Sequence, residues 1–69
     1  MNEFQKRFRL LCDEQNIIQK YLAEDLNMSQ QKVSTWATGR NEPNIDDLIK
    51  LADYLGVTVG QLIGSEKLN

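Results

Sequence analysis

Apolar residues recur at helical spacing through almost the whole chain, in five short segments separated by Asn, Gly or Pro. Within each segment they fall three or four positions apart, which places them along one face of an α-helix. No pair of segments has the pattern of paired strands. Because 69 residues suffice for one domain with a small core, we predict an all-α, compact five-helix fold. A single domain would span 1–69, with 65–69 as a frayed tail.

Capping and turn residues set the limits of the five predicted helices. A side chain with a hydroxyl or amide precedes a predicted start, and Gly or Asn, which tolerate the left-handed conformation, follows a predicted end. The segment from Thr58 to Gln61 also has the pattern of a capping box. The start signals are Ser29, Asn44 and Thr58, and the end signals are Asn16, Asn27, Gly39 and Gly56.

The same spacing predicts which side chains face the core. We expect the small Ala23 at the crossing of the second and third helices, because it lets them approach closely. Trp36 lies with Val33 on the inward side, so we interpret it as core rather than as a platform for stacking bases. The predicted inward residues are Phe4, Phe8, Leu11, Cys12, Ile18, Leu22, Ala23, Leu26, Val33, Trp36, Ala37, Ile45, Leu48, Ile49, Leu51, Ala52, Leu55, Val59, Leu62 and Ile63.

Residues 28–40 carry no acidic side chain, although the whole chain has a net charge of −2. The helix predicted there has Lys32 in its first turn, where the helix dipole disfavours a cation. The short connection 27–29 between the second and third helices is typical of a helix-turn-helix. In that motif the helix at about 29–38 lies in the major groove of DNA, and we expect DNA phosphates to supply the missing anions.

Several short motifs follow one another in order over most of the chain. They are Ile17-Ile-Gln19, Leu22-Ala23, Ser29, Val33 with Trp36, Gly39-Arg-Asn-Glu-Pro43, Leu48-Ile-Lys-Leu-Ala52 and Leu55-Gly-Val57. From Arg7 to Ile63 the chain therefore resembles the phage-repressor and Cro-type helix-turn-helix family, also called the XRE family. The resemblance implies a lambda-repressor-like DNA-binding domain with the helix-turn-helix at its second and third helices. It also implies a sequence-specific regulator of transcription, a repressor of phage, prophage or bacterial type, that acts as a homodimer on a near-palindromic double-stranded DNA operator.

Matched by position, the resemblance implies two sets of DNA contacts. The base-contacting set is Gln30, Gln31, Lys32, Ser34 and Thr35, and the phosphate-contacting set is Gln19, Ser29, Arg40 and Asn41. A Gln amide can pair with adenine through two hydrogen bonds, and a Thr methyl can contact the methyl of thymine.

Two departures from the family pattern affect these expectations. Ile18 stands where relatives have a capping Ser or Thr, so either Asn16 caps the second helix one turn early or the helix starts uncapped. Cys12 and Ala37 stand where many relatives have an Arg and a Glu that form an ion pair. Replacing both partners is less costly than losing one, so the double replacement supports the alignment. It also removes one possible phosphate-binding arginine.

The acidic balance argues against strong general affinity for nucleic acid. Up to Arg40 there are six basic and five acidic side chains, whereas two basic and five acidic side chains follow it. Residues 26–41 contain Lys32 and Arg40 and no acid, and the basic cluster 6–9 is either a solvated face or a contact to the DNA backbone. So few cations predict weak non-specific binding, and useful affinity then requires a dimer with recognition helices about 34 Å apart.

Composition excludes several other classes of protein. With no histidine and one cysteine, Cys12, the chain offers no internal disulfide and no usual transition-metal site. It has no nucleophile paired with a base and no phosphate-cradling loop, so we expect no enzyme, cofactor or small-molecule substrate. Asp46 and Asp47 have a structural role as first-turn residues of a helix. No apolar run is long enough to span a bilayer and the first residues do not form a secretory signal, so we expect a cytoplasmic protein.

Two questions stay open at this level. The alternative function is a protein-interaction module, an antirepressor or adaptor, that uses the acidic second half or exposed apolar residues near Leu62, Ile63 and Leu68. The dimer has two possible origins. Either the fourth and fifth helices pair through Val57, Val59, Leu62 and Ile63, or the chain is the amino-terminal part of a longer repressor whose other domain dimerises.

Overall fold

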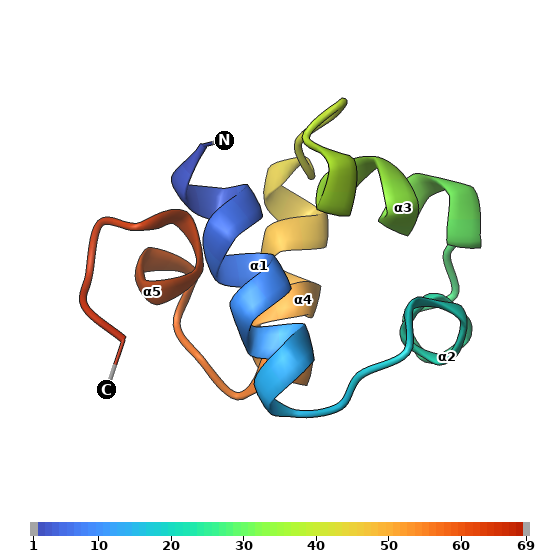
Figure 1. The fold of residues 1–69 in the computed structure, drawn as a ribbon, viewed down its shortest axis with the longest axis horizontal. Helices are drawn as coiled ribbons and strands as arrows, with labels where there is room; N and C mark the ends of the chain where they lie inside the picture. The colour runs from blue at the N-terminus through green and yellow to red at the C-terminus, as the bar shows by residue number, and fades with distance from the viewer. Residues whose placement is uncertain (1, 69) are drawn as a thin grey trace.

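The computed structural model describes residues 2–68, and these form five helices and no strand. The helices are α1 (Glu3–Glu14), α2 (Gln19–Asp25), α3 (Gln30–Thr38), α4 (Ile45–Leu55) and α5 (Val59–Ile63). α1 stands in the middle, with α4 behind it, α5 on one side and α2 and α3 on the other (Figure 1). The predicted all-α fold with five helices is confirmed. None of the helices in this described part is long and apolar enough to cross a membrane.

Every helix contributes at least one fully buried side chain to a single core. These side chains are Phe8, Leu22, Val33, Trp36, Leu51 and Leu62. The Trp36 and Phe8 rings form a T-shaped pair, with 6.1 Å between centroids and 79° between planes, and Phe4 stacks on Phe8 at 5.6 Å. The prediction that Trp36 is a core residue is therefore confirmed.

The predicted capping residues act as caps. Ser29, Asn44 and Thr58 each accept a hydrogen bond from the backbone N–H three residues further on. Asn16 and Asn27 end the first two helices with positive φ angles of 54° and 57°. Asn tolerates this left-handed region better than most residues, which explains why no glycine is needed at these turns.

The second helix begins without a side-chain cap. Ile18 occupies the N-cap position of α2 and makes no capping hydrogen bond. Of the two possibilities that the sequence left open, an early cap by Asn16 and an uncapped start, the structure has the uncapped start, because Asn16 belongs to the turn that ends α1.

Four isoleucines that the sequence placed inward are exposed. Ile18, Ile45, Ile49 and Ile63 have exposed fractions of 58%, 75%, 55% and 42%. Ile18 precedes α2 instead of lying within it, and Ile17 packs against the core in its place. In α5 the buried position belongs to Leu62, whereas Ile63 is the last helical residue. The inward assignments of these four residues were therefore wrong.

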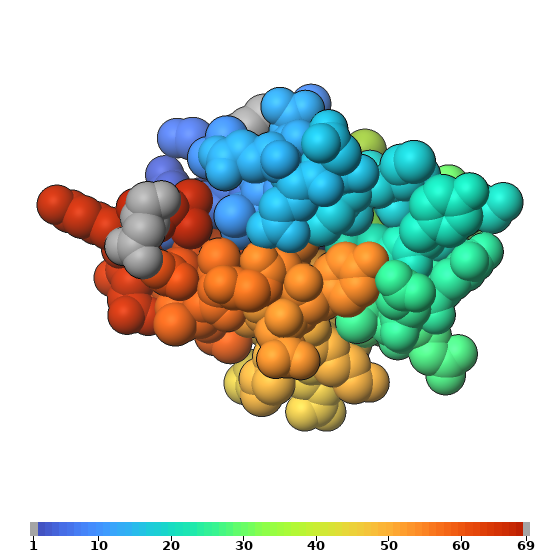
Figure 2. Space-filling view, turned by 90° about the horizontal axis from the view of Figure 1, so that it is seen from below, coloured from blue at the N-terminus to red at the C-terminus, as the bar shows by residue number. Residues whose placement is uncertain are grey.

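In α4 the buried face is rotated relative to the predicted one. It includes Asp47, Leu51 and Leu55, which follow one another at helical spacing. The sequence analysis gave Asp47 only a role as a first-turn residue of the helix and did not place it on the buried face. The start of α4, gold in Figure 2, projects from the surface, so Ile45 and Ile49 remain in solvent.

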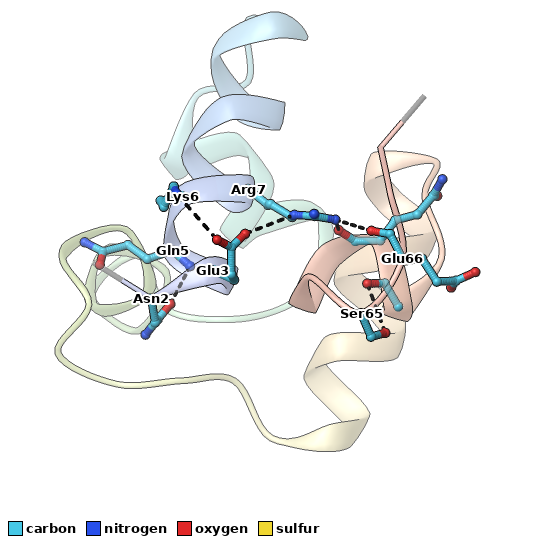
Figure 3. Close-up of polar contacts among 9 residues, drawn as sticks. Asn2, Glu3, Gln5, Lys6, Arg7, Ser65 and Glu66 are labelled. Atoms are coloured by element: carbon cyan, nitrogen blue, oxygen red, sulfur yellow. Dashed lines mark hydrogen bonds and ion pairs between the residues drawn. The ribbon is translucent and has the colours of Figure 1, made fainter.

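The end of the described chain is held against α1. The Arg7 guanidinium donates hydrogen bonds to the carbonyl oxygens of Gln61, at 2.7 Å, and of Glu66, and it also pairs with Glu3 (Figure 3). Gln61 Nε2 donates to Lys67 O at 3.1 Å, and Leu68 packs at the edge of the core. Residues 65–68 of the predicted tail therefore make contacts in the fold, while residue 69 lies outside the described residues.

Two single substitutions in α4 test which side of this helix is buried. We expect Leu51→Ala to lower the free energy of unfolding by about 2–5 kcal/mol, because it leaves a cavity in the core. Ile45→Ala should change it by less than about 0.5 kcal/mol, because the side chain already lies in solvent. Urea unfolding followed by Trp36 fluorescence measures both, and equal losses in the two variants would contradict the observed rotation.

Candidate nucleic-acid interface

Helix α3 lies along one edge of the molecule with one side open (Figure 1). Its inner side is anchored by Val33 and Trp36, which are fully buried. Gln31, Thr35 and Thr38 recur at a spacing of four and then three residues, so they form a row on the side away from the core. Gln31 and Thr38 are exposed and Thr35 is half-buried. The open side of α3 thus presents one amide and two hydroxyl groups.

A shallow hollow lies between α3 and the loop that follows it. It is lined by Ser29, Gln31, Lys32, Thr35, Trp36, Asn41 and Glu42. Five of the nine predicted DNA contacts therefore lie together on this hollow. Of the others, Gln30 and Arg40 are exposed and Ser34 is half-buried.

Gln19, the remaining predicted contact, lies on the opposite flank of α3. It lines a second hollow that also includes Thr38 and Arg9. Arg9 was part of the basic cluster whose role the sequence left open. Its side chain is exposed, and neither Arg9 nor Arg40 makes an ion pair or hydrogen bond within residues 2–68. The open row of α3 is therefore flanked by Gln19 and Arg9 on one side and by Asn41 on the other.

Lys32 meets an anion within the protein. Its Nζ lies 2.8 Å from Oδ2 of Asp47, in the first turn of α4. Asp47 is nearly buried, with 8% of its side chain exposed, and Oδ2 has no aligned hydrogen-bond donor among the described residues. The contact is therefore an attraction between opposite charges without hydrogen-bond alignment. The sequence analysis expected DNA to supply the anion for this first-turn lysine, but α4 already supplies one.

Two polar anchors that the sequence did not reveal hold the helix-turn-helix in place. Gln5 is buried in α1, and its Nε2 donates a hydrogen bond to Ala37 O near the end of α3 at 3.0 Å. Tyr54 in α4 donates to Asp25 Oδ2 at the end of α2 at 2.8 Å. This hydrogen bond, together with burial, raises the pKa of Tyr54. A sequence signal for Gln5 existed, because it lies seven positions before Cys12 on the same side of α1.

Gly39 allows α3 to end directly against Gln5. Its φ of 81° lies in the left-handed region, and a Cβ at this position would come within 2.7 Å of Gln5 Oε1. Both the backbone conformation and the close approach therefore favour glycine. The end of α3 and the start of the loop carrying Arg40 and Asn41 are fixed together as a result.

Comparison with known proteins agrees with this arrangement. The family model described as helix-turn-helix matches residues 6–62, which is most of the chain. The chain belongs to the XRE helix-turn-helix family. The resemblance drawn from the sequence motifs is confirmed.

Two relatives share this helix-turn-helix domain. The HTH-type transcriptional activator BcrR from Enterococcus faecalis is 32% identical over 66 residues, which are 96% of this chain and 32% of that protein. The crystal structure of a transcriptional regulator from Listeria innocua superposes with a TM-score of 0.85 and 26% identity, covering all of this chain and 64% of that one. The chain thus spans about a third of the curated relative and just under two thirds of the structural one.

The two residues that replace the family's ion pair, Cys12 and Ala37, lie near the same part of the surface. Both line the same hollow, next to Gln19. Both positions hold small side chains here. Burial raises the pKa of the Cys12 thiol to about 11, so the thiol is protonated at neutral pH.

The raised pKa makes Cys12 slow to react with alkylating reagents. A pKa of about 11 leaves roughly a hundredth of the thiolate of an ordinary cysteine, and the higher nucleophilicity of a more basic thiolate recovers about a factor of ten. At pH 8 we expect Cys12 in the folded domain to react with iodoacetamide about tenfold more slowly than in urea, as followed by mass spectrometry. Equal rates in both conditions would contradict the burial of the thiol.

Proposed function

We propose that this helix-turn-helix domain binds double-stranded DNA in a sequence-specific manner and regulates transcription, with α3 in the major groove. The observation that carries the proposal is the open row of amide and hydroxyl groups on α3 between two flanks that carry phosphate-binding candidates. The major groove is wide enough for an α-helix. A helix lying there has a phosphate backbone on each side, which suits Gln19 and Arg9 on one flank and Asn41 on the other.

Base recognition in this proposal depends on Gln30, Gln31, Ser34 and Thr35. The exposed amide of Gln31 can form two hydrogen bonds with adenine. The Thr35 hydroxyl donates to Lys32 O at 2.6 Å, so it has an acceptor lone pair and a methyl group left for a base edge. A methyl group in this position suits contact with thymine.

Phosphate contacts in this proposal come from Gln19, Ser29, Arg40 and Asn41, with Arg9 as an addition. The Ser29 oxygen already accepts from Lys32 N at 3.1 Å, but its hydroxyl hydrogen is available to donate. Arg9 and Arg40 have exposed guanidinium groups without partners in the described structure. So few free cations predict a shallow dependence of binding on salt concentration.

We further propose that regulation is by repression in the cytoplasm, as the family resemblance implies. Repression requires only that the domain occupy its operator, and the chain contains the α3 surface proposed to bind it. The relative from E. faecalis is named an activator, and activation would require a further contact with the transcription machinery. A reporter gene with the selected operator placed over its promoter tests the direction: repression lowers its expression when the domain is produced.

Selection of bound duplexes from a random double-stranded pool tests sequence recognition. We expect a near-palindrome for the wild type. Gln31→Ala should relax the preference at one base pair per half-site by about 1–3 kcal/mol. Arg40→Ala should weaken binding to all sequences and lower the slope of log K against log salt by about 0.9, because one phosphate contact is lost. The slope is measured by fluorescence titration at several salt concentrations.

Lys50→Ala is the matched control for the loss of charge. Lys50 is an exposed cation on α4 that lies outside the predicted contact set, and we expect no change in slope. If no motif emerged and binding stayed at non-specific strength, the proposed function would be wrong. The alternative of a protein-interaction surface near Leu62, Ile63 and Leu68 would then be next, although Leu62 is fully buried and Leu68 half-buried.

We also propose that two copies pair through α4 and α5 on the near-palindromic operator. The predicted contribution of Leu62 to this interface was wrong, since its side chain is fully buried. Of the residues predicted for this interface, Ile63 is 42% exposed, and Val57 and Val59 are half-buried. This smaller surface favours a weak dimer that DNA stabilises.

Sedimentation with and without the selected operator tests the dimer. We expect Ile63→Glu to weaken dimer formation and cooperative binding to the full operator, while binding to a half-site is unchanged. Leu10→Glu is the control, because Leu10 is similarly exposed at 47% but lies on α1. A wild type that remains monomeric at high concentration even on the full operator would rule out the pairing.

A further inference from the structure

The ion pair between α3 and α4 points to a control on DNA affinity. We infer that Asp47 limits the affinity for DNA: it keeps the Lys32 ammonium from pairing with DNA phosphate and so lowers the affinity for all sequences alike. This inference rests on the proposed DNA-binding function. It assigns to Asp47, which lies outside the predicted contact set, an effect on that function through Lys32.

The position of Lys32 makes it the cation nearest to the proposed base contacts. It lies one residue after Gln31 and three before Thr35, and all three line the same hollow beside α3. Its side chain is 44% exposed, so the ammonium is at the edge of the surface proposed to meet DNA. Without Asp47 it would be available to a phosphate.

The position of Asp47 makes the ion pair hard to break. Its Oδ2 is inaccessible to solvent and has no hydrogen-bond donor among residues 2–68, so the Lys32 ammonium at 2.8 Å is the positive charge that compensates it. Moving Lys32 to a phosphate would leave a nearly buried carboxylate without a counter-charge, which is strongly unfavourable. The pair is therefore retained when DNA is bound.

The helix dipoles also favour the ion pair between Lys32 and Asp47. Asp47 lies in the first turn of α4, where a carboxylate is favoured, and Lys32 lies in the first turn of α3, where a cation is disfavoured. The carboxylate thus stabilises α4 and offsets the unfavourable position of Lys32 at the same time. Both effects hold the two side chains together.

Neutralisation of Lys32 lowers the part of the affinity that does not depend on sequence. Of the two cations in residues 26–41, only Arg40 then remains free to attract phosphate. General affinity comes from phosphate contacts, whereas discrimination comes from base contacts. When one phosphate contact is removed and the neutral Gln, Ser and Thr groups stay in place, a larger share of the binding free energy comes from base contacts.

Four proteins are titrated with the selected operator and with a scrambled duplex of equal length, over a range of salt concentrations, to test this inference. The proteins are the wild type, Asp47→Asn, Lys32→Gln and the double variant. Asp47→Asn should release Lys32, steepen the salt slope by about 0.9 and tighten binding to the scrambled duplex roughly fivefold at 0.15 M salt. Binding to the operator should tighten by a similar factor, because a phosphate contact does not distinguish sequences.

The other variants distinguish release of Lys32 from a general change in charge. Asp46→Asn removes the same charge from the adjacent, exposed position, and it should leave the slope near that of the wild type. The double variant should return the slope to the wild-type value, and it keeps the fold because neither charge is left alone. Lys32→Gln should also keep the wild-type slope, since Lys32 makes no phosphate contact in the wild type.

Two results would overturn the inference without affecting the proposed function. One is an Asp47→Asn variant that binds like Asp46→Asn. The other is a Lys32→Gln variant whose slope is shallower by about 0.9 while it remains folded by circular dichroism, because Lys32 would then be a phosphate contact. A wild type that binds neither duplex would instead overturn the proposed function, and this inference with it.

Discussion

The contact between Trp36 and Phe8 determines how α3 sits on the rest of the molecule. Trp36 is the largest fully buried side chain among the described residues, and its ring forms a T-shaped pair with Phe8, on which Phe4 stacks. A large aromatic side chain in a close-packed core leaves its helix little freedom to rotate. Because the inner side of α3 is fixed in this way, the row of Gln31, Thr35 and Thr38 must face outward. Gln5 and Gly39 then fix the end of the same helix, so the presentation of this row follows from packing on the inner side.

The sequence predicted the five helices and their caps because these depend on local interactions. Ser29, Asn44 and Thr58 bond to groups three residues away, and such bonds can be read from spacing alone. The orientation of α4 depends instead on what packs against it. An isoleucine is apolar on either side of a helix, so the spacing of Ile45 and Ile49 could not reveal that Asp47 takes a place on the buried face. The error came from treating burial as a property of residue type.

Five of the predicted contact residues lie on one hollow beside α3, but the charge of the site differs from what the sequence suggested. Counting Lys32 and Arg40 in residues 26–41 gives a positive surface only if both cations face solvent. Formal charge along a sequence does not show which charges are paired, and the partner of Lys32 lies fifteen positions away in another helix. Arg9 adds a cation that counting residues 26–41 misses, because the fold brings this α1 residue to the side of α3. Both are long-range relations that a single sequence does not contain.

An acidic protein can still recognise DNA if recognition depends mainly on neutral groups. Amides and hydroxyls discriminate between bases through hydrogen bonds whose geometry must match, whereas a cation attracts any phosphate. The open side of α3 consists of groups of the first kind, and the cation closest to them is held by a nearly buried carboxylate. A surface of this kind has little affinity until its hydrogen bonds are satisfied by a matching sequence. The net charge of −2 is thus compatible with a sequence-specific binder, and it disfavours one that acts mainly by coating DNA.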